Sequence, residues 1–226
     1  VVVYRDDHIQ LMETSSGRAF YSIPGSDDAR ENAGPCSDGK NLYLPKHREI
    51  IRLNFDTLKV EASAHTNGKV TAGPILAGDL LVYCSNRSVI EALDAITLDM
   101  VWSFALEDPE LHAVGMDSAC AYAHGILFVG GLDGNLYALD AKTGSRIWKY
   151  QVGEAVSTSP IVCGDVVYLN ASGKGLCGLN AFSGEVLCQM QFWQGDYQMG
   201  TSELAVSGSI LLAGSDKLYA FVSEQG

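Results

Sequence analysis

The stretch Leu136–Asp140 reads LYALD and is one of five copies of a short phrase in this 226-residue chain. Each copy alternates apolar with small residues, closes on an acidic residue or Asn, and runs into a tight turn. A sixth copy, Leu218–Phe221, is shorter. The full copies close at Glu13, Asn54, Asp94, Asp140 and Asn180, with spacings of 41, 40, 46 and 40 residues. A fixed period near forty residues predicts a repeat architecture, which defines a fold and not a function.

Each repeat unit contains four strand-like runs. In one unit these are residues 118–123, 126–129, 136–140 and 146–152, separated by turns such as Asp133–Asn135. Four short antiparallel strands per forty-odd residues predict the blade of a β-propeller. We expect neighbouring blades to cover both faces of the innermost and second strands, which are apolar. The acidic residue or Asn that ends the third strand is expected to cap the turn that follows it.

The copies predict about six blades. The first copy, residues 1–23, contains strands two, three and four, and the last, residues 201–222, contains strands one, two and three. Four complete copies lie between them. Two arrangements are consistent with this count: the two incomplete blades meet where the ring closes, or further chain or self-association completes the circle.

The bulk composition describes an acidic globular chain. Hydrophobic residues make up 47% of it, and 27 acids against 15 bases give a net charge of −12. Such a surface repels phosphate backbones, so nucleic acid is not expected as a partner. No apolar run approaches the length of about 18 residues that a membrane helix requires, so membrane insertion is not expected either.

The six cysteines form no C-x-x-C pair and no spacing typical of zinc sites. Most lie inside apolar strand runs, which favours an interpretation as small buried hydrophobes. Scattered thiols of this kind favour a cytoplasmic location. Two N-x-S triplets, at Asn86 and Asn170, keep a periplasmic or extracellular location as the alternative.

The segment Ala138–Trp148 resembles the tryptophan-docking repeat of PQQ-like (quinoprotein-type) propellers, A-x-D-x-x-T-G-x-x-x-W. Ala92–Trp102 matches too, with Leu98 in place of the glycine, and the other copies keep only parts of the pattern. The resemblance covers essentially the whole chain and implies one propeller domain over residues 1–226. It also implies that Trp102 and Trp148 pack between neighbouring blades. Because such propellers usually have seven or eight blades, a fragment of a larger ring is an open alternative.

One predicted rim carries most of the unusual residues. It is built from the turns that join strands two and three and from the segments that follow strand four. Loops are where binding residues concentrate, and the opposite rim has plain turns. The aromatic pair Trp193 and Tyr197 in one loop is a candidate hot spot for partner binding. The candidate partner-binding residues on this rim are His8, Arg30, Glu31, His47, Arg48, Arg87, His112, Trp193, Asp196 and Tyr197.

The sequence favours a binding or scaffold module over an enzyme. The resemblance implies that a quinoprotein dehydrogenase would need PQQ, an ion such as Ca²⁺ on acidic ligands, and commonly a vicinal disulfide. The chain has no adjacent cysteines and no acidic ligand spacing like that of a calcium loop. We therefore expect no catalytic residue, metal or cofactor, and a protein or small polar ligand as partner. The alternatives are a quinoprotein dehydrogenase fragment and a glycan-binding or glycan-cleaving propeller.

Overall fold

In a computed structural model the described residues are 2–5, 8–24, 33–106, 118–153, 155–156, 158–171, 175–190, 204–208, 210–214 and 218–222. These residues form strands and turns, and no helix among them is suited to crossing a membrane. The strands are β1 (Val2–Arg5), β2 (His8–Met12), β3 (Ala19–Pro24), β4 (Cys36–Ser37), β5 (Asn41–Lys46), β6 (Glu49–Asn54), β7 (Lys59–His65), β8 (Ile75–Ala77), β9 (Leu80–Cys84), β10 (Val89–Asp94), β11 (Met100–Ala105), β12 (Ala121–Ala123), β13 (Ile126–Gly130), β14 (Asn135–Asp140), β15 (Arg146–Gln151), β16 (Ile161–Cys163), β17 (Val166–Ala171), β18 (Gly175–Asn180), β19 (Val186–Met190), β20 (Leu204–Ser207), β21 (Ile210–Gly214) and β22 (Leu218–Val222).

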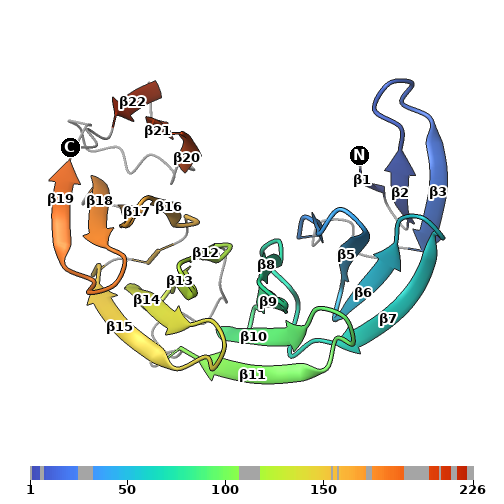
Figure 1. Cartoon of the computed structure of the whole chain (residues 1–226), viewed down its shortest axis with the longest axis horizontal. Helices are drawn as coiled ribbons and strands as arrows, with labels where there is room; N and C mark the ends of the chain where they lie inside the picture. Colours follow the sequence, from blue (N-terminus) through green and yellow to red (C-terminus); the bar gives the residue numbers. More distant parts are fainter. Residues whose placement is uncertain are drawn as a thin grey trace.

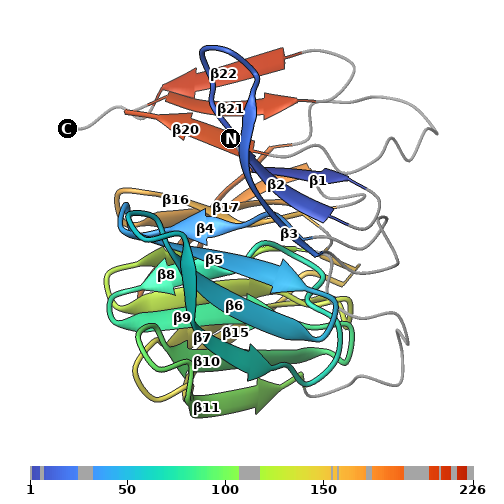
Figure 2. The ribbon, with the colours of Figure 1, turned by 90° about the vertical axis from the view of Figure 1, so that its right-hand side faces the viewer.

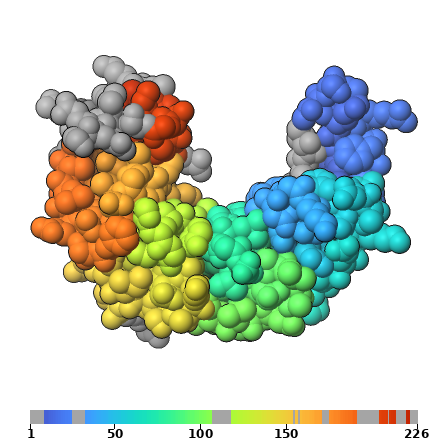
Figure 3. Space-filling view, viewed as in Figure 1, coloured from blue at the N-terminus to red at the C-terminus, as the bar shows by residue number. Residues whose placement is uncertain are grey.

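The strands form six antiparallel sheets in chain order, which confirms the predicted propeller blades. We number the sheets as blades one to six: β1–β3, β4–β7, β8–β11, β12–β15, β16–β19 and β20–β22. Blades one and six have three strands each in the described part. The blades follow one another around an open arc, with β1–β3 and β20–β22 at its two ends and apart (Figures 1 and 3). The strands run across the thickness of the arc, so their turns lie on two rims (Figure 2).

The core lies between blades and not within them. Strands β10, β13, β14 and β18 are buried along nearly their whole length, because blades cover both of their faces. The expectation that the innermost strands would be covered in the same way is wrong. The innermost strands β8, β12 and β16 are mostly half-buried, since they line the inner side of the arc. In the outermost strands β11 and β15 the residues are exposed or half-buried, apart from the buried Trp102 on β11.

The turn after the third strand is capped as predicted in blades two to five. In blade four the Asp140 carboxylate accepts hydrogen bonds from the backbone N–H groups of Lys142 (3.1 Å) and Thr143 (2.8 Å) and from the Thr143 hydroxyl (2.8 Å). Gly144 then donates its N–H to the Asp140 carbonyl (2.8 Å) with φ at +69°. Asn54, Asp94 and Asn180 accept the same pair of backbone bonds in their own blades.

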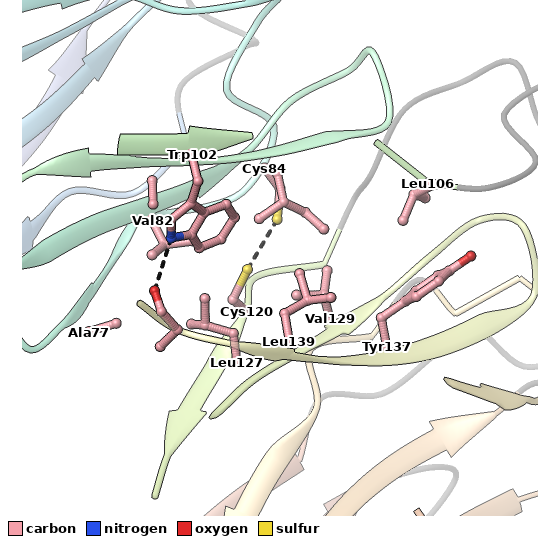
Figure 4. Close-up of a cluster of buried hydrophobic side chains, with 13 residues drawn as sticks. Ala77, Val82, Cys84, Trp102, Leu106, Cys120, Leu127, Val129, Tyr137 and Leu139 are labelled. Carbon is pink, nitrogen blue, oxygen red and sulfur yellow. Dashed lines mark hydrogen bonds between the residues drawn. The ribbon is translucent and has the colours of Figure 1, made fainter. Parts of the chain in front are cut away.

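Trp102 joins blade three to blade four. Its indole N–H donates to the Ala141 carbonyl of the next blade at 3.0 Å (Figure 4). The ring lies against Gly144, where a Cβ would meet indole atoms at 2.6 Å, so a side chain at this turn would exclude the tryptophan. Trp148 repeats the arrangement one blade on: it donates to the Ala181 carbonyl at 2.9 Å, and its ring lies against Gly184.

At the interface between blades two and three the sizes of the two residues are reversed. Ala62 occupies the position of the tryptophan on β7, and Leu98 occupies the position of the turn glycine. Leu98 is buried in spite of a φ of +61°, which is unusual for leucine, and Ala62 packs against the apolar cluster that contains it. The Ala95 carbonyl, equivalent to that of Ala141, accepts a hydrogen bond from the Tyr43 hydroxyl at 3.0 Å instead. At this interface the larger side chain, Leu98, therefore belongs to the turn of the following blade and not to the fourth strand of the preceding one.

This arrangement predicts energetic coupling between Ala62 and Leu98. We expect Leu98→Gly to leave a cavity and to cost about 2–3 kcal/mol of stability. Ala62→Trp should also destabilise the chain, because the indole would meet the Leu98 side chain. The double variant A62W/L98G should recover at least about 1 kcal/mol relative to the sum of the single variants. Urea unfolding of the four proteins measures the coupling, and strictly additive effects would contradict the exchange of large and small residues.

The capped turn at Asp140 predicts that the free energy of unfolding depends on pH, and that substitution of Asp140 removes this contribution. Hydrogen bonds from the Thr143 side chain and backbone lower the pKa of Asp140 below its ordinary value. A lowered pKa means that the carboxylate stabilises the fold above the unfolded pKa of about 3.9 and that this contribution is lost as the pH falls through the folded value. Asp140→Asn should keep the cap, as Asn54 and Asn180 do, and lose this pH dependence. Asp140→Ala should cost about 1 kcal/mol at pH 7 in thermal or urea unfolding. Equal stability of the Ala and Asn variants would contradict the capping role.

Candidate functional site

The two kinds of loop expected on one rim lie on the same rim in the structure. The first residue after a fourth strand donates its backbone N–H to a carbonyl in the turn between strands two and three of the same blade. These bonds run from Thr66 to Arg48 (2.9 Å), from Leu106 to Ser88 (3.0 Å) and from Val152 to Gly134 (2.9 Å). In blades two, three and four this bond fixes the two loops against each other, so that this part of the rim is a frame with defined positions for its side chains.

Residues 66–70 extend the frame from blade two to blade three. Thr66 is bonded to the turn of blade two, as above, and three residues further the Lys69 N–H donates to the side-chain oxygen of Asn86 (2.9 Å) in the turn of blade three. In return, the Asn86 N–H donates to the Lys69 carbonyl (2.9 Å). The guanidinium of Arg87 lies 3.4 Å from the side-chain oxygen of Asn67, to which it donates. The rims of two blades are thereby joined into one surface.

The buried carboxylate of Glu91 holds this surface in place from the protein interior. Glu91 on β10 has only 2% of its surface exposed, and its carboxylate accepts a hydrogen bond from the Tyr83 hydroxyl. The backbone N–H of Asn67 lies 3.3 Å from both the Glu91 carboxylate and the Tyr83 oxygen. Burial, followed by the hydrogen bond and charge of Glu91, raises the pKa of Tyr83, so the hydroxyl stays protonated and donates. The linker between the blades is therefore held by a buried acid.

Three of the predicted rim residues lie in the described rim of blades two and three. His47 and Arg48 form the exposed two-residue turn between β5 and β6, and Arg87 is exposed in the turn between β9 and β10. His47 has a φ of +54°, which histidine adopts more readily than most residues. His8 begins β2 in blade one. The remaining candidates, Arg30, Glu31, His112, Trp193, Asp196 and Tyr197, lie outside the described residues.

Two features of the molecule were not predicted from the sequence. Glu91 sits inside an apolar strand, where the alternating pattern gives no sign that a carboxylate is buried against Tyr83. A surface hollow also lies on the opposite rim of blade one, and it is lined by Met12, Glu13, Thr14, Arg18, Ala19 and Phe20. Within the ranges that the structure describes, no group of three or more His, Cys, Asp or Glu side chains is placed to hold a metal ion.

Comparisons with known proteins point to one propeller family. A family model described as outer membrane protein assembly factor BamB matches residues 87–226. The outer membrane protein assembly factor BamB of Yersinia pestis is 22% identical over an alignment of 230 positions, which covers 96% of this chain and 57% of that protein. The quinone-dependent alcohol dehydrogenase subunit of Acetobacter aceti is 33% identical over an alignment of 122 positions, which covers 50% of this chain and 15% of that protein.

A solved structure gives the same fold. The crystal structure of BamB from Moraxella catarrhalis matches with a TM-score of 0.76 and 20% identity, over 98% of this chain and 66% of that one. The chain thus spans a little over half the length of the Yersinia relative. At this identity the structural likeness shows the β-propeller fold alone.

The dehydrogenase relatives raise the question of a quinone site with its metal ion. The described residues do not fit such a site. They offer no cluster of metal-binding side chains, and the buried acid Glu91 is already engaged by Tyr83 and by the backbone of Asn67.

The buried acid predicts that Tyr83→Phe destabilises the protein. Loss of the hydroxyl leaves a buried carboxylate with one donor fewer, which should cost about 2 kcal/mol in urea unfolding. It should also loosen residues 66–70, which amide hydrogen exchange at Asn67 would detect. Tyr122→Phe is the matched control, because Tyr122 is 40% exposed, and its effect should stay within about 0.5 kcal/mol. Equal unfolding midpoints for the two variants would contradict the supporting role of Tyr83.

Proposed function

We propose that this chain, which belongs to the β-propeller family described as outer membrane protein assembly factor BamB, is a non-catalytic scaffold that binds a partner protein through one rim. The proposal is supported by the rigid frame that joins the rims of blades two and three. Such a frame orders its side chains before a partner arrives, so binding costs little conformational entropy. The relatives named as assembly factors support a role in the assembly of outer membrane proteins.

The charge of this surface indicates the chemistry of the partner. The chain as a whole carries a net charge of −12. Basic residues nevertheless gather on the rim of blades two and three, where Lys46, Arg48, Lys69 and Arg87 lie in or beside the turns. Glu49, at the base of the blade-two turn, offsets part of this charge. We therefore infer that the bound segment carries carboxylates, because complementary charge speeds encounter and selects the partner.

The proposal predicts that charge reversal on this rim weakens partner binding. Arg48→Glu and Arg87→Glu together should weaken the retention of partner proteins by a tagged chain about tenfold or more, since two attractive contacts become repulsive. Affinity purification from cell envelopes, followed by quantitative mass spectrometry, measures the loss. Binding to the unchanged chain should also weaken as salt is raised.

A matched control separates this surface from a general effect of charge. Lys142→Glu reverses an exposed lysine in a turn of the opposite rim and should leave binding unchanged. Circular dichroism and unfolding midpoints establish that all variants are folded. Retention of every partner by the R48E/R87E variant, or an equal loss in K142E, would refute the assignment of this rim.

A further inference from the structure

Two cysteines from different blades meet in the core. Cys84 ends β9 in blade three, and Cys120 precedes β12 in blade four; their sulfur atoms are 3.3 Å apart (Figure 4). Both side chains are buried, with 1% and 7% of their surface exposed. They belong to the apolar cluster that also holds Trp102, so the sulfur pair lies in the interface that this tryptophan closes.

The contact is closer than packing of two small hydrophobes requires. The sequence favoured an interpretation of these cysteines as buried apolar residues, and burial alone would serve that role. Here the two sulfur atoms point toward each other across the interface, about 1.3 Å beyond the length of a disulfide bond. A small approach of the two side chains would suffice to join them.

We propose that Cys84 and Cys120 form a disulfide that links blade three covalently to blade four. The oxidant is a disulfide, either a small one such as oxidised glutathione or that of a thiol oxidoreductase. One cysteine attacks the oxidant as thiolate, forming a mixed disulfide and releasing one thiol. The second cysteine then attacks the sulfur of the first and releases the other thiol, so two protein thiols and one disulfide give one protein disulfide and two thiols.

Burial decides when this exchange takes place. The hydrogen bond with Cys120 and then burial raise the pKa of Cys84 well above its ordinary value, which leaves little of the reactive thiolate in the folded interface. The exchange therefore belongs to the stage at which blade four has not yet closed on blade three. Once the interface is packed, the same burial shields the disulfide from reductants.

The disulfide would stabilise the arc at a defined place. It closes a loop between positions 36 residues apart in the chain, and a cross-link of this span removes considerable freedom from the unfolded chain. The expected consequence is a Tm about 10 °C higher for the oxidised protein than for the reduced one.

The experiment folds the chain from denaturant with oxidised glutathione as oxidant and, in parallel, with a phosphine reductant. The oxidised product is alkylated in denaturant without reduction and digested. One cross-linked peptide pair containing Cys84 and Cys120 is expected, with a mass lower than that of the two separate peptides by two hydrogen atoms. Thermal unfolding of the two products should differ by about 10 °C.

Cys84→Val and Cys120→Ala each remove one partner, and each should abolish the difference in Tm between oxidised and reduced protein. Cys163→Ala is the matched control, because Cys163 is half-buried in blade five and should leave that difference intact. If one variant does not fold, the other still tests the link. Alkylation of both Cys84 and Cys120 after oxidative folding would overturn the proposal, and so would equal Tm values for the proteins folded with oxidant and with reductant.

Discussion

Each blade of this propeller has two apolar faces and no core of its own, so every blade is stable only against its neighbours. The four apolar clusters of the described chain all lie between adjacent blades. The fit between the fourth strand of one blade and the turn of the next therefore governs the whole arc. Trp102 against Gly144 and Ala62 against Leu98 are two ways of filling the same space, and in both a donor from one blade reaches a carbonyl of the next.

Most of the fold was predictable because its signals are local. The forty-residue period, the turn residues and the capping Asp or Asn all act within a few positions, and the structure confirms six blades and the capped turns. The burial of the strands was harder to predict, because composition does not tell an inner strand beside open space from a middle strand between blades. The exchange at Ala62 and Leu98 went unrecognised, because each residue alone looks like decay of the motif.

The location of the candidate site was predictable from the sequence, but the interactions that support it were not. Strand order alone puts the turns that hold His47, Arg48 and Arg87 on one rim, and the backbone bonds of the described blades agree. The support beneath them was hidden, since Glu91 meets Tyr83 only when neighbouring strands pair in register. The thiol contact of Cys84 with Cys120 is equally invisible in sequence, because it depends on how two blades pack.

The mixture of interface types has a consequence for assembly of the arc. A repeat with identical interfaces offers every blade several equivalent partners, and wrong pairings then compete with the right one. Here Trp102 fits the glycine turn of blade four, whereas the turn of blade three carries buried Leu98, which would clash with an indole. Ala62 in turn would leave a void against Gly144. The departures from the repeat thus act against misordered blades, and the loss of two motif residues becomes a source of specificity.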